Sequence, residues 1–115
     1  MGESAQTRPP LDRAAGLLGL ASRAGQISSG EDGAIALIRA GKAAIALMDA
    51  ATGPNTSKRL IDACGYRNVT LSRLPEGMLG KAIGKANRMV AAVQKGSLAD
   101  SLSAALKGAE LVIKA

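Results

Sequence analysis

The chain has no histidine, tryptophan or phenylalanine, one tyrosine (Tyr66) and one cysteine (Cys64). Histidine is the side chain that most often acts as a general base near neutral pH, so its absence excludes histidine-containing triads and histidine metal ligands. A single cysteine forms neither an internal disulfide nor a thiolate metal site. We therefore expect no catalytic residues, no metal site and no cofactor.

The shortage of aromatic side chains excludes a second class of site. Proteins that bind single strands by stacking successive bases need several exposed rings, and this chain has one. The core must be built from Ala, Leu, Ile, Val and Met. Cys64 falls on the apolar side of an expected helix, which favours a buried structural thiol over a nucleophile.

Long apolar runs are also missing. No run approaches the roughly 18 residues of a membrane span. The first residues, MGESAQTRPP, are polar and then proline-rich, without the apolar segment of a secretory signal. Together with the single cysteine, these features predict a cytoplasmic protein. A length of 115 residues indicates one domain.

Positive charge is in excess and is concentrated in one part of the chain. The net charge is +6, and the residues from Thr56 to Lys95 hold eight basic side chains against the acids Asp62 and Glu76. The basic residues are Lys58, Arg59, Arg67, Arg73, Lys81, Lys85, Arg88 and Lys95. A localised excess favours a polyanionic partner. A merely solvated basic surface remains the alternative.

Apolar periodicity and the positions of Gly and Pro predict alternating helices and strands. The expected helices are Leu11–Ala24, Glu31–Ala40, Ser57–Cys64, Pro75–Ile83 and a last helix capped by Ser97, and the expected strands are Gln26–Ser29, Ala44–Asp49, Asn68–Leu71 and Arg88–Val93. Such alternation is typical of an α/β protein, a three-layer α-β-α sandwich around a largely parallel sheet. We expect a disordered lead-in over residues 1–9, one domain over 10–107 and a C-terminal tail over 108–115.

The stretch from Leu17 to Ala43 is the most informative part of the chain. It predicts the end of a helix, a stop at Gly25, a short strand, and a turn at Ser28–Gly30 into the next helix. The N-terminus of that helix presents free N–H groups and about +0.5 of an elementary charge, which suits a phosphate or a base edge. The adjacent acids Glu31 and Asp32 point about 100° apart on a helix and do not form a catalytic pair.

The glycines do not form a nucleotide-binding motif. Gly16, Gly19 and Gly25 lie on a helix and its end, not between a strand and a helix, and they do not have the G-x-G-x-x-G spacing. The run from Gly77 to Lys81 is too short for a phosphate-binding loop. A small enzyme or nucleotide-binding module is thus disfavoured, although a thermal-shift screen with nucleotides would detect one.

Several segments in the same order resemble one known family. GLASRAGQISSGEDGAIALIRAGKA, AIALMDA, NTSKRLIDAC and LGKAIGKANRMVAAV together resemble the L7Ae-like ribosomal and kink-turn RNA-binding proteins, and most of all the bacterial YlxQ-type branch. The resemblance covers about residues 17–93. It implies an α-β-α sandwich around a four-stranded mixed sheet, as in ribosomal L30e-like proteins.

The resemblance also implies where RNA binds. The family site is the strand-to-helix turn that corresponds here to residues 28–32, together with the loop before the last strand, here residues 84–89. Carried onto this chain, the RNA contacts are Arg23, Gln26, Ser28, Ser29, Gly30, Glu31, Asp32, Lys85, Ala86, Asn87 and Arg88. The loop residues supply basic and polar groups, and Arg23 adds a phosphate contact.

The chain departs from the kink-turn pattern at three positions. In the family's kink-turn binders the turn reads Gly-x-Asn-Glu, with a lysine one helical turn later. Here Gly30 matches, but Asp32, Gly33 and Ala36 replace Asn, Glu and Lys. An ionised Asp only accepts hydrogen bonds, whereas Asn also donates them. We expect binding by shape and backbone contacts, with altered selectivity toward kink-turns.

The sequence favours a non-enzymatic protein that binds structured RNA, ribosomal RNA or the ribosome above all. We expect a monomer with no DNA or membrane partner. The alternative is a protein-interaction adaptor that keeps the fold and has lost RNA binding, and Gly33 and Ala36 support it.

Overall fold

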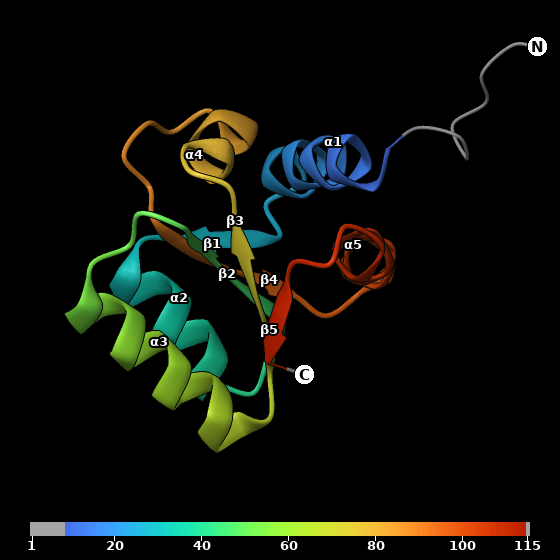
Figure 1. Ribbon diagram of the computed structural model, residues 1–115. Coiled ribbons are helices and arrows are strands. Elements are labelled where there is room, and N and C mark those ends of the chain that lie inside the picture. Colours follow the sequence, from blue (N-terminus) through green and yellow to red (C-terminus); the bar gives the residue numbers. More distant parts are fainter. Residues whose placement is uncertain (1–8, 115) are drawn as a thin grey trace, which may run out of the picture.

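The computed structural model describes residues 9–114, which form three layers with a sheet between two groups of helices (Figure 1). The helices are α1 (Pro10–Arg23), α2 (Glu31–Arg39), α3 (Pro54–Arg67), α4 (Met78–Ile83) and α5 (Ser97–Gly108). The strands are β1 (Ile27–Ser29), β2 (Ala43–Asp49), β3 (Thr70–Leu74), β4 (Val90–Gln94) and β5 (Val112–Lys114). Apart from Pro9, which is the N-cap of α1, the lead-in expected over residues 1–9 lies outside the described residues. None of the helices described is long and apolar enough to cross a membrane.

The α/β class, the three-layer sandwich and the mixed sheet that the family resemblance implied are confirmed, whereas the largely parallel sheet that the alternation of elements predicted is wrong. The strand order is β1-β4-β2-β3-β5, and only β2 and β3 form a parallel pair. β4 lies between β1 and β2 and runs antiparallel to both. The direction reverses because the six-residue α4 and the loop after it turn the chain back beside the sheet instead of returning it to the start of the next parallel strand.

The sheet has a fifth strand in the segment that we expected to be a tail. Residues Val112–Lys114 pair antiparallel with β3, and the partners are Leu71 with Lys114 and Ser72 with Val112. The preceding helix α5 ends at Gly108. The predicted four-stranded sheet and the predicted tail from residue 108 are therefore both incorrect.

The sheet separates two apolar cores. In β2, Ile45 and Leu47 pack into the core formed with α1, α4 and α5, whereas Ala46 and Met48 pack into the core formed with α2 and α3. Side chains of a strand point alternately to its two faces, so one apolar run supplies both cores. This central strand ends at Asp49, close to the turns that form the candidate site.

Helix α3 is longer than its sequence signals predicted. It begins at Pro54 after the N-cap Gly53, three residues before the predicted start at Ser57. Proline is favourable there because its missing N–H has no partner in the first turn of a helix. The helix continues three residues beyond the predicted end at Cys64, to Arg67, and is followed by a left-handed Asn68.

Helix α1 packs against both α4 and α5. Its face toward the core is formed by the buried Ala14, Leu18 and Ala21, whereas Leu11 is 39% exposed. A Cβ on Gly19 would lie 3.3 Å from the carbonyl oxygen of Ala82, so Gly19 permits the close approach of α4. This close approach holds α4 against α1, and the loop that follows α4 is part of the candidate site.

Candidate functional site

The turn between β1 and α2 is positioned by the edge of the sheet. Ser28 and Ser29 pair with β4, and the N–H of Gly30 donates a 2.9 Å hydrogen bond to the carbonyl oxygen of Val90. Gly30 is the N-cap of α2 and has φ +90°, a backbone conformation that favours glycine. The first N–H groups of α2 lack carbonyl partners within the helix and form the positive end of its dipole.

The loop from Gly84 to Met89 joins α4 to β4, and all of its residues are exposed. It packs on its own helix: the N–H of Lys85 donates to the carbonyl oxygen of Gly80 at 2.9 Å. A Cβ on Gly80 would lie 2.9 Å from the carbonyl oxygen of Lys85, so the loop backbone uses the space that a side chain would fill. The loop therefore has a fixed base from which Lys85, Asn87 and Arg88 project.

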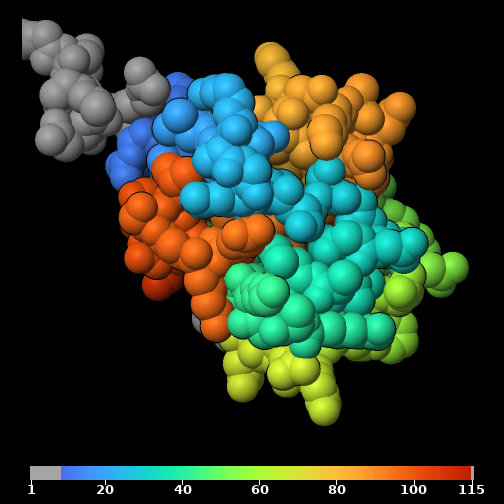
Figure 2. Space-filling view, turned by 180° about the vertical axis from the view of Figure 1, so that it is seen from behind, coloured from blue at the N-terminus to red at the C-terminus, as the bar shows by residue number. Residues whose placement is uncertain are grey.

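The turn and the loop meet at Gly30 and Arg88. A Cβ on Gly30 would lie 2.6 Å from Nη1 of Arg88, so the guanidinium occupies the space over this glycine. In Figure 2 the orange region of α4 and its loop lies beside the blue-to-cyan region of β1 and the start of α2. A permanent positive charge thus stands beside a helix N-terminus, and both favour the approach of an anion.

Glu31, the first residue of α2, connects that helix to α3. Its Oε1 accepts a 2.7 Å hydrogen bond from the Thr56 hydroxyl, and its Oε2 accepts one from the Arg59 guanidinium, with which it also forms an ion pair. The Thr56 hydrogen bond, followed by the charge and hydrogen bond of Arg59, lowers the pKa of Glu31. Both carboxylate oxygens are in use, so Glu31 holds the start of α2 against α3.

Asp49, at the end of β2, ties three connections together. Its side chain is buried and accepts 2.7 Å hydrogen bonds from the N–H groups of Ala51 and Gly77. Its own N–H donates to the carbonyl oxygen of Met89, which lies at the end of the exposed loop. The carboxylate thus links the β2–α3 turn to the β3–α4 turn, the backbone N–H of Asp49 holds the end of the loop, and a small hollow of about 160 Å³ lies beside the residue.

Most of the predicted contact residues gather around this edge. Ser28, Ser29, Gly30, Glu31 and Asp32 form one continuous turn, and the segment Lys85, Ala86, Asn87 and Arg88 forms the neighbouring loop. The side chain of Asp32 is exposed. The geometry brings the two segments together, and the contacts of their side chains with RNA stay predictions.

The two remaining predicted residues lie at the margin. Arg23 is exposed in the last turn of α1, and its Nη1 would lie 3.4 Å from a Cβ on Gly19, near the seam with α4. The side-chain oxygen of Gln26 is buried without a hydrogen-bond partner among the described residues. The backbone N–H of Gln26 donates to Ala21, and its carbonyl accepts from Gln94. As it stands, Gln26 acts through its backbone, which links α1 to the sheet.

Sequence reasoning missed three residues that shape the site: Asp49, Thr56 and Arg59. Asp49 had a usable signal, because an acid directly after a buried apolar strand must find hydrogen-bond donors. Thr56 and Arg59 had none, because only the packing of α3 beside α2 brings them to Glu31. Glu31 was predicted as an RNA contact, and the structure shows that side chains of α3 hydrogen-bond to both of its carboxylate oxygens.

The basic residues between Lys58 and Lys95 do not form one patch. Lys81, Lys85 and Arg88 lie on α4 and its loop, whereas Lys58, Arg59 and Arg67 lie on α3. Lys95 follows β4 at the end opposite Arg88. Within residues 9–114 the ion pairs are Lys58–Asp62 and Arg59–Glu31, so the cations of α4 and its loop are not neutralised by a carboxylate there.

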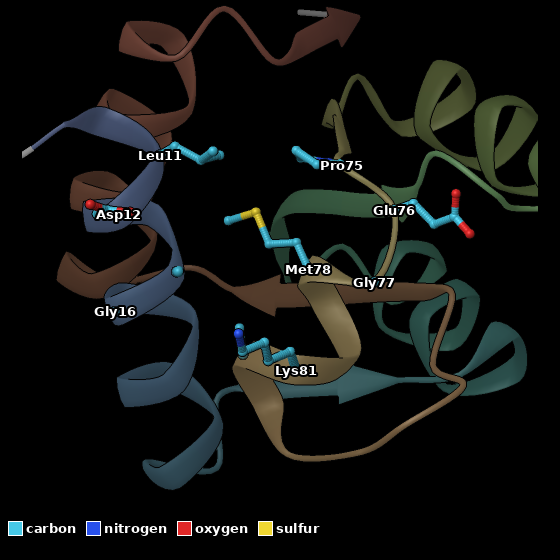
Figure 3. A pocket seen from close by; sticks show the side chains of 10 residues that line it. Leu11, Asp12, Gly16, Pro75, Glu76, Gly77, Met78 and Lys81 are labelled. Carbon is cyan, nitrogen blue, oxygen red and sulfur yellow. The ribbon is translucent and has the colours of Figure 1, made fainter.

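A larger hollow of about 540 Å³ lies between α1 and α4 (Figure 3). Leu11 and Met78 point into it from the two sides, and Lys81 reaches across from α4. Glu76 points away from it in Figure 3, and Asp12 lies on the α1 side. The two carboxylates do not face one another across the hollow, so it does not have the geometry of an acid–base pair.

Known proteins with similar sequences identify the family of this fold. Residues 12–102 match the ribosomal protein L7Ae/L30e/S12e/Gadd45 family. The chain is 39% identical over 87 residues to RNA-binding protein YlxQ of Bacillus subtilis (strain 168), a match that covers 75% of this chain and 87% of that protein.

Two solved structures share the fold. A protein of unknown function from Bacillus halodurans C superposes with a TM-score of 0.78 and 31% identity, over 83% of this chain and 97% of that one. The Giardia lamblia 15.5kD RNA binding protein superposes with a TM-score of 0.73 and 19% identity, over 94% and 98% of the two chains, and shows the fold alone. The family match and the 39% identical relative show the same membership that the sequence motifs indicated. The chain belongs to the ribosomal protein L7Ae/L30e/S12e/Gadd45 family, in its YlxQ-type branch.

Proposed function

We propose that this protein binds structured RNA, ribosomal RNA in particular, and does so without catalysing a reaction. The single observation that supports it most is the contact between Arg88 and Gly30, which sets a guanidinium against the N-terminal turn of α2. Phosphate binds favourably where backbone N–H groups and a fixed positive charge converge. The name of the YlxQ relative, an RNA-binding protein, supports the same partner.

The proposed interface consists of the β1–α2 turn and the loop from Gly84 to Met89. Lys85 and Arg88 contact phosphates, and Ser28 and Ser29 contribute polar groups at the turn. Such contacts position a protein on a folded RNA with little reading of base edges. Recognition therefore depends on the shape and spacing of the RNA backbone.

In this proposal the protein selects kink-turns less strongly than the family's kink-turn binders do. Asp32 is exposed where kink-turn binders have an asparagine, and as a carboxylate it offers no donor to a base edge. Gly33 and Ala36 are exposed as well and have no polar side chain to offer. We expect weaker binding to a kink-turn duplex than to ribosomal RNA.

Filter binding with two double variants tests the interface. Lys85→Ala/Arg88→Ala removes two charges from the loop, and Lys95→Ala/Lys107→Ala removes two exposed charges elsewhere. Measured at low salt against purified bacterial ribosomal RNA, the first variant should lose affinity and the second should lose much less. Equal affinity of the first variant and the wild type would contradict the interface.

The adaptor alternative makes a different prediction in the same assay. A protein that keeps the fold only to contact other proteins binds neither ribosomal RNA nor a kink-turn duplex. The absence of binding to both would therefore favour an adaptor. Binding to ribosomal RNA that depends on Lys85 and Arg88 would exclude it.

A further inference from the structure

The only aromatic ring of the chain is almost entirely exposed at the end of α3. Tyr66 has 83% of its surface accessible, and the guanidinium of Arg67 lies over its ring, 5.7 Å from the ring centroid. A hollow of about 440 Å³ beside it is lined by Arg39, Arg59, Asp62, Ala63 and Tyr66. The Tyr66 ring is not part of either core, so core packing does not explain why a tyrosine stands at this position.

The hollow lies at the end of α2, and the proposed interface lies at the start of the same helix. Helices α2 and α3 run side by side in the same direction on one face of the sheet (Figure 1), because Glu31 meets Arg59 at their starts and Arg39 meets Tyr66 at their ends. From Glu31 to Arg39 the distance along α2 is about 12 Å at 1.5 Å per residue. One RNA strand is able to reach both ends of this groove.

The charges beside the ring suit a phosphate. Within residues 9–114, Arg39 and Arg67 have no carboxylate partner, whereas Asp62 is paired with Lys58. Arg39 and Arg67 each lie in the last turn of their helix, where the dipole favours a cation. The dipole accounts for the two arginines but not for the exposed tyrosine near them, and arginine and an aromatic face together are suited to binding a stacked base and its phosphate.

We propose that the groove between α2 and α3 binds one unpaired nucleotide of the RNA, with its base stacked on Tyr66 and its phosphate held by Arg39 and Arg67. The inference rests on the proposed RNA binding, because the nucleotide belongs to the same RNA. One ring accommodates one base, which agrees with the lack of rings for a longer stacking platform. The site extends the interface by the length of α2.

A fluorine label makes Tyr66 a direct reporter. Because it is the only tyrosine, protein grown with 3-fluorotyrosine gives a single ¹⁹F resonance from the described site. We expect this resonance to shift or broaden when purified ribosomal RNA or a ten-nucleotide oligoadenylate is added. Tyr66→Ala should weaken binding of the oligoadenylate at least about fivefold, because stacking on an aromatic ring contributes on the order of 1–3 kcal/mol per base. Tyr66→Phe is the control that keeps the ring.

The outcomes separate this site from the proposed interface. An unchanged ¹⁹F resonance at saturating ribosomal RNA, with affinity that still depends on Lys85 and Arg88, would overturn the Tyr66 site and leave the interface standing. A shifted resonance with affinity independent of Lys85 and Arg88 would support the Tyr66 site and overturn the interface. No binding of either RNA would overturn both and favour a protein occupant.

Discussion

Nη1 of Arg88 lies 2.6 Å from the position that a Cβ atom on Gly30 would occupy. The two residues come from a strand-to-helix turn and from a loop that are nearly sixty positions apart in the sequence. Their contact depends on the placement of β4 beside β1, which brings both segments to one edge of the sheet. The arrangement of the candidate site therefore depends on the order of the strands in the sheet.

Gly30→Ala should be destabilising. The substitution introduces a Cβ at a residue with φ +90° and displaces the Arg88 guanidinium, and we expect it to lower the free energy of unfolding by about 1–3 kcal/mol. Gly33→Ala makes the same chemical change three residues later, where the new Cβ meets only the Cβ of Ser28 at 3.8 Å. That control should raise stability by roughly 0.5–1 kcal/mol. Urea unfolding measures both, and equal effects would show that the Gly30 backbone is not strained.

Asp49→Ala should loosen the β2–α3 and β3–α4 turns. It leaves the N–H groups of Ala51 and Gly77 without their acceptor, and we expect a loss of about 2 kcal/mol or more in the free energy of unfolding. Amide hydrogen exchange should speed up at Ala51 and Gly77, whose N–H groups lose their acceptor. Asp62→Ala removes an exposed carboxylate and should change stability little. Wild-type exchange rates at Ala51 and Gly77 in Asp49→Ala would contradict this role.

Glu31 should make stability depend on pH. Its folded-state pKa is lowered, chiefly by the Thr56 hydrogen bond, so folding favours the ionised carboxylate. This stabilisation is present above the unfolded-state pKa, near 4.5, and is lost as the pH falls through the folded-state pKa. Glu31→Gln should therefore be less stable than the wild type at neutral pH, and the difference should shrink in acid. Glu76→Gln is the control, and a Glu31→Gln difference that is constant with pH would exclude the linkage.

Kink-turn binding should be recoverable by substitution. Asp32, Gly33 and Ala36 are all exposed on the first turns of α2, and the space beside Gly33 admits a side chain. The triple variant Asp32→Asn/Gly33→Glu/Ala36→Lys should bind a kink-turn duplex more tightly than the wild type does. Gel-shift titration with the duplex and with a straight duplex of equal length measures the gain. Equal binding of the two duplexes by the variant would mean that these side chains do not set selectivity.

The local order of the fold was readable from the sequence, whereas its long-range pairings were not. The expected elements from Leu11 to Asp49 differ from the observed ones by about one residue at each boundary, because glycine ends helices and apolar runs form buried strands. Strand β5 was missed because its three residues are too few to show the alternation of a strand. Their order comes from pairing with β3. The antiparallel placement of β4 was likewise set by tertiary contacts.

The candidate site was predictable in its segments but not in its connections. The glycine at position 30 marked the turn, and basic residues marked the loop. The contact between Gly30 and Arg88, the clamp of Glu31 by Thr56 and Arg59, and the burial of Asp49 each join residues distant in the chain. Such contacts follow from sheet order, which a pattern along one sequence does not define.

The salt dependence of RNA binding tests the central claim most directly. The slope of log affinity against log salt concentration should be measured for ribosomal RNA with the wild type, Lys85→Ala/Arg88→Ala and Lys95→Ala/Lys107→Ala. If Lys85 and Arg88 contact phosphates, the slope for the first variant should be shallower by about 1.5–2. The reason is that a protein with fewer phosphate contacts releases fewer counterions from the RNA when it binds. The second variant should keep the wild-type slope. Identical slopes for the wild type and Lys85→Ala/Arg88→Ala would contradict the proposed interface.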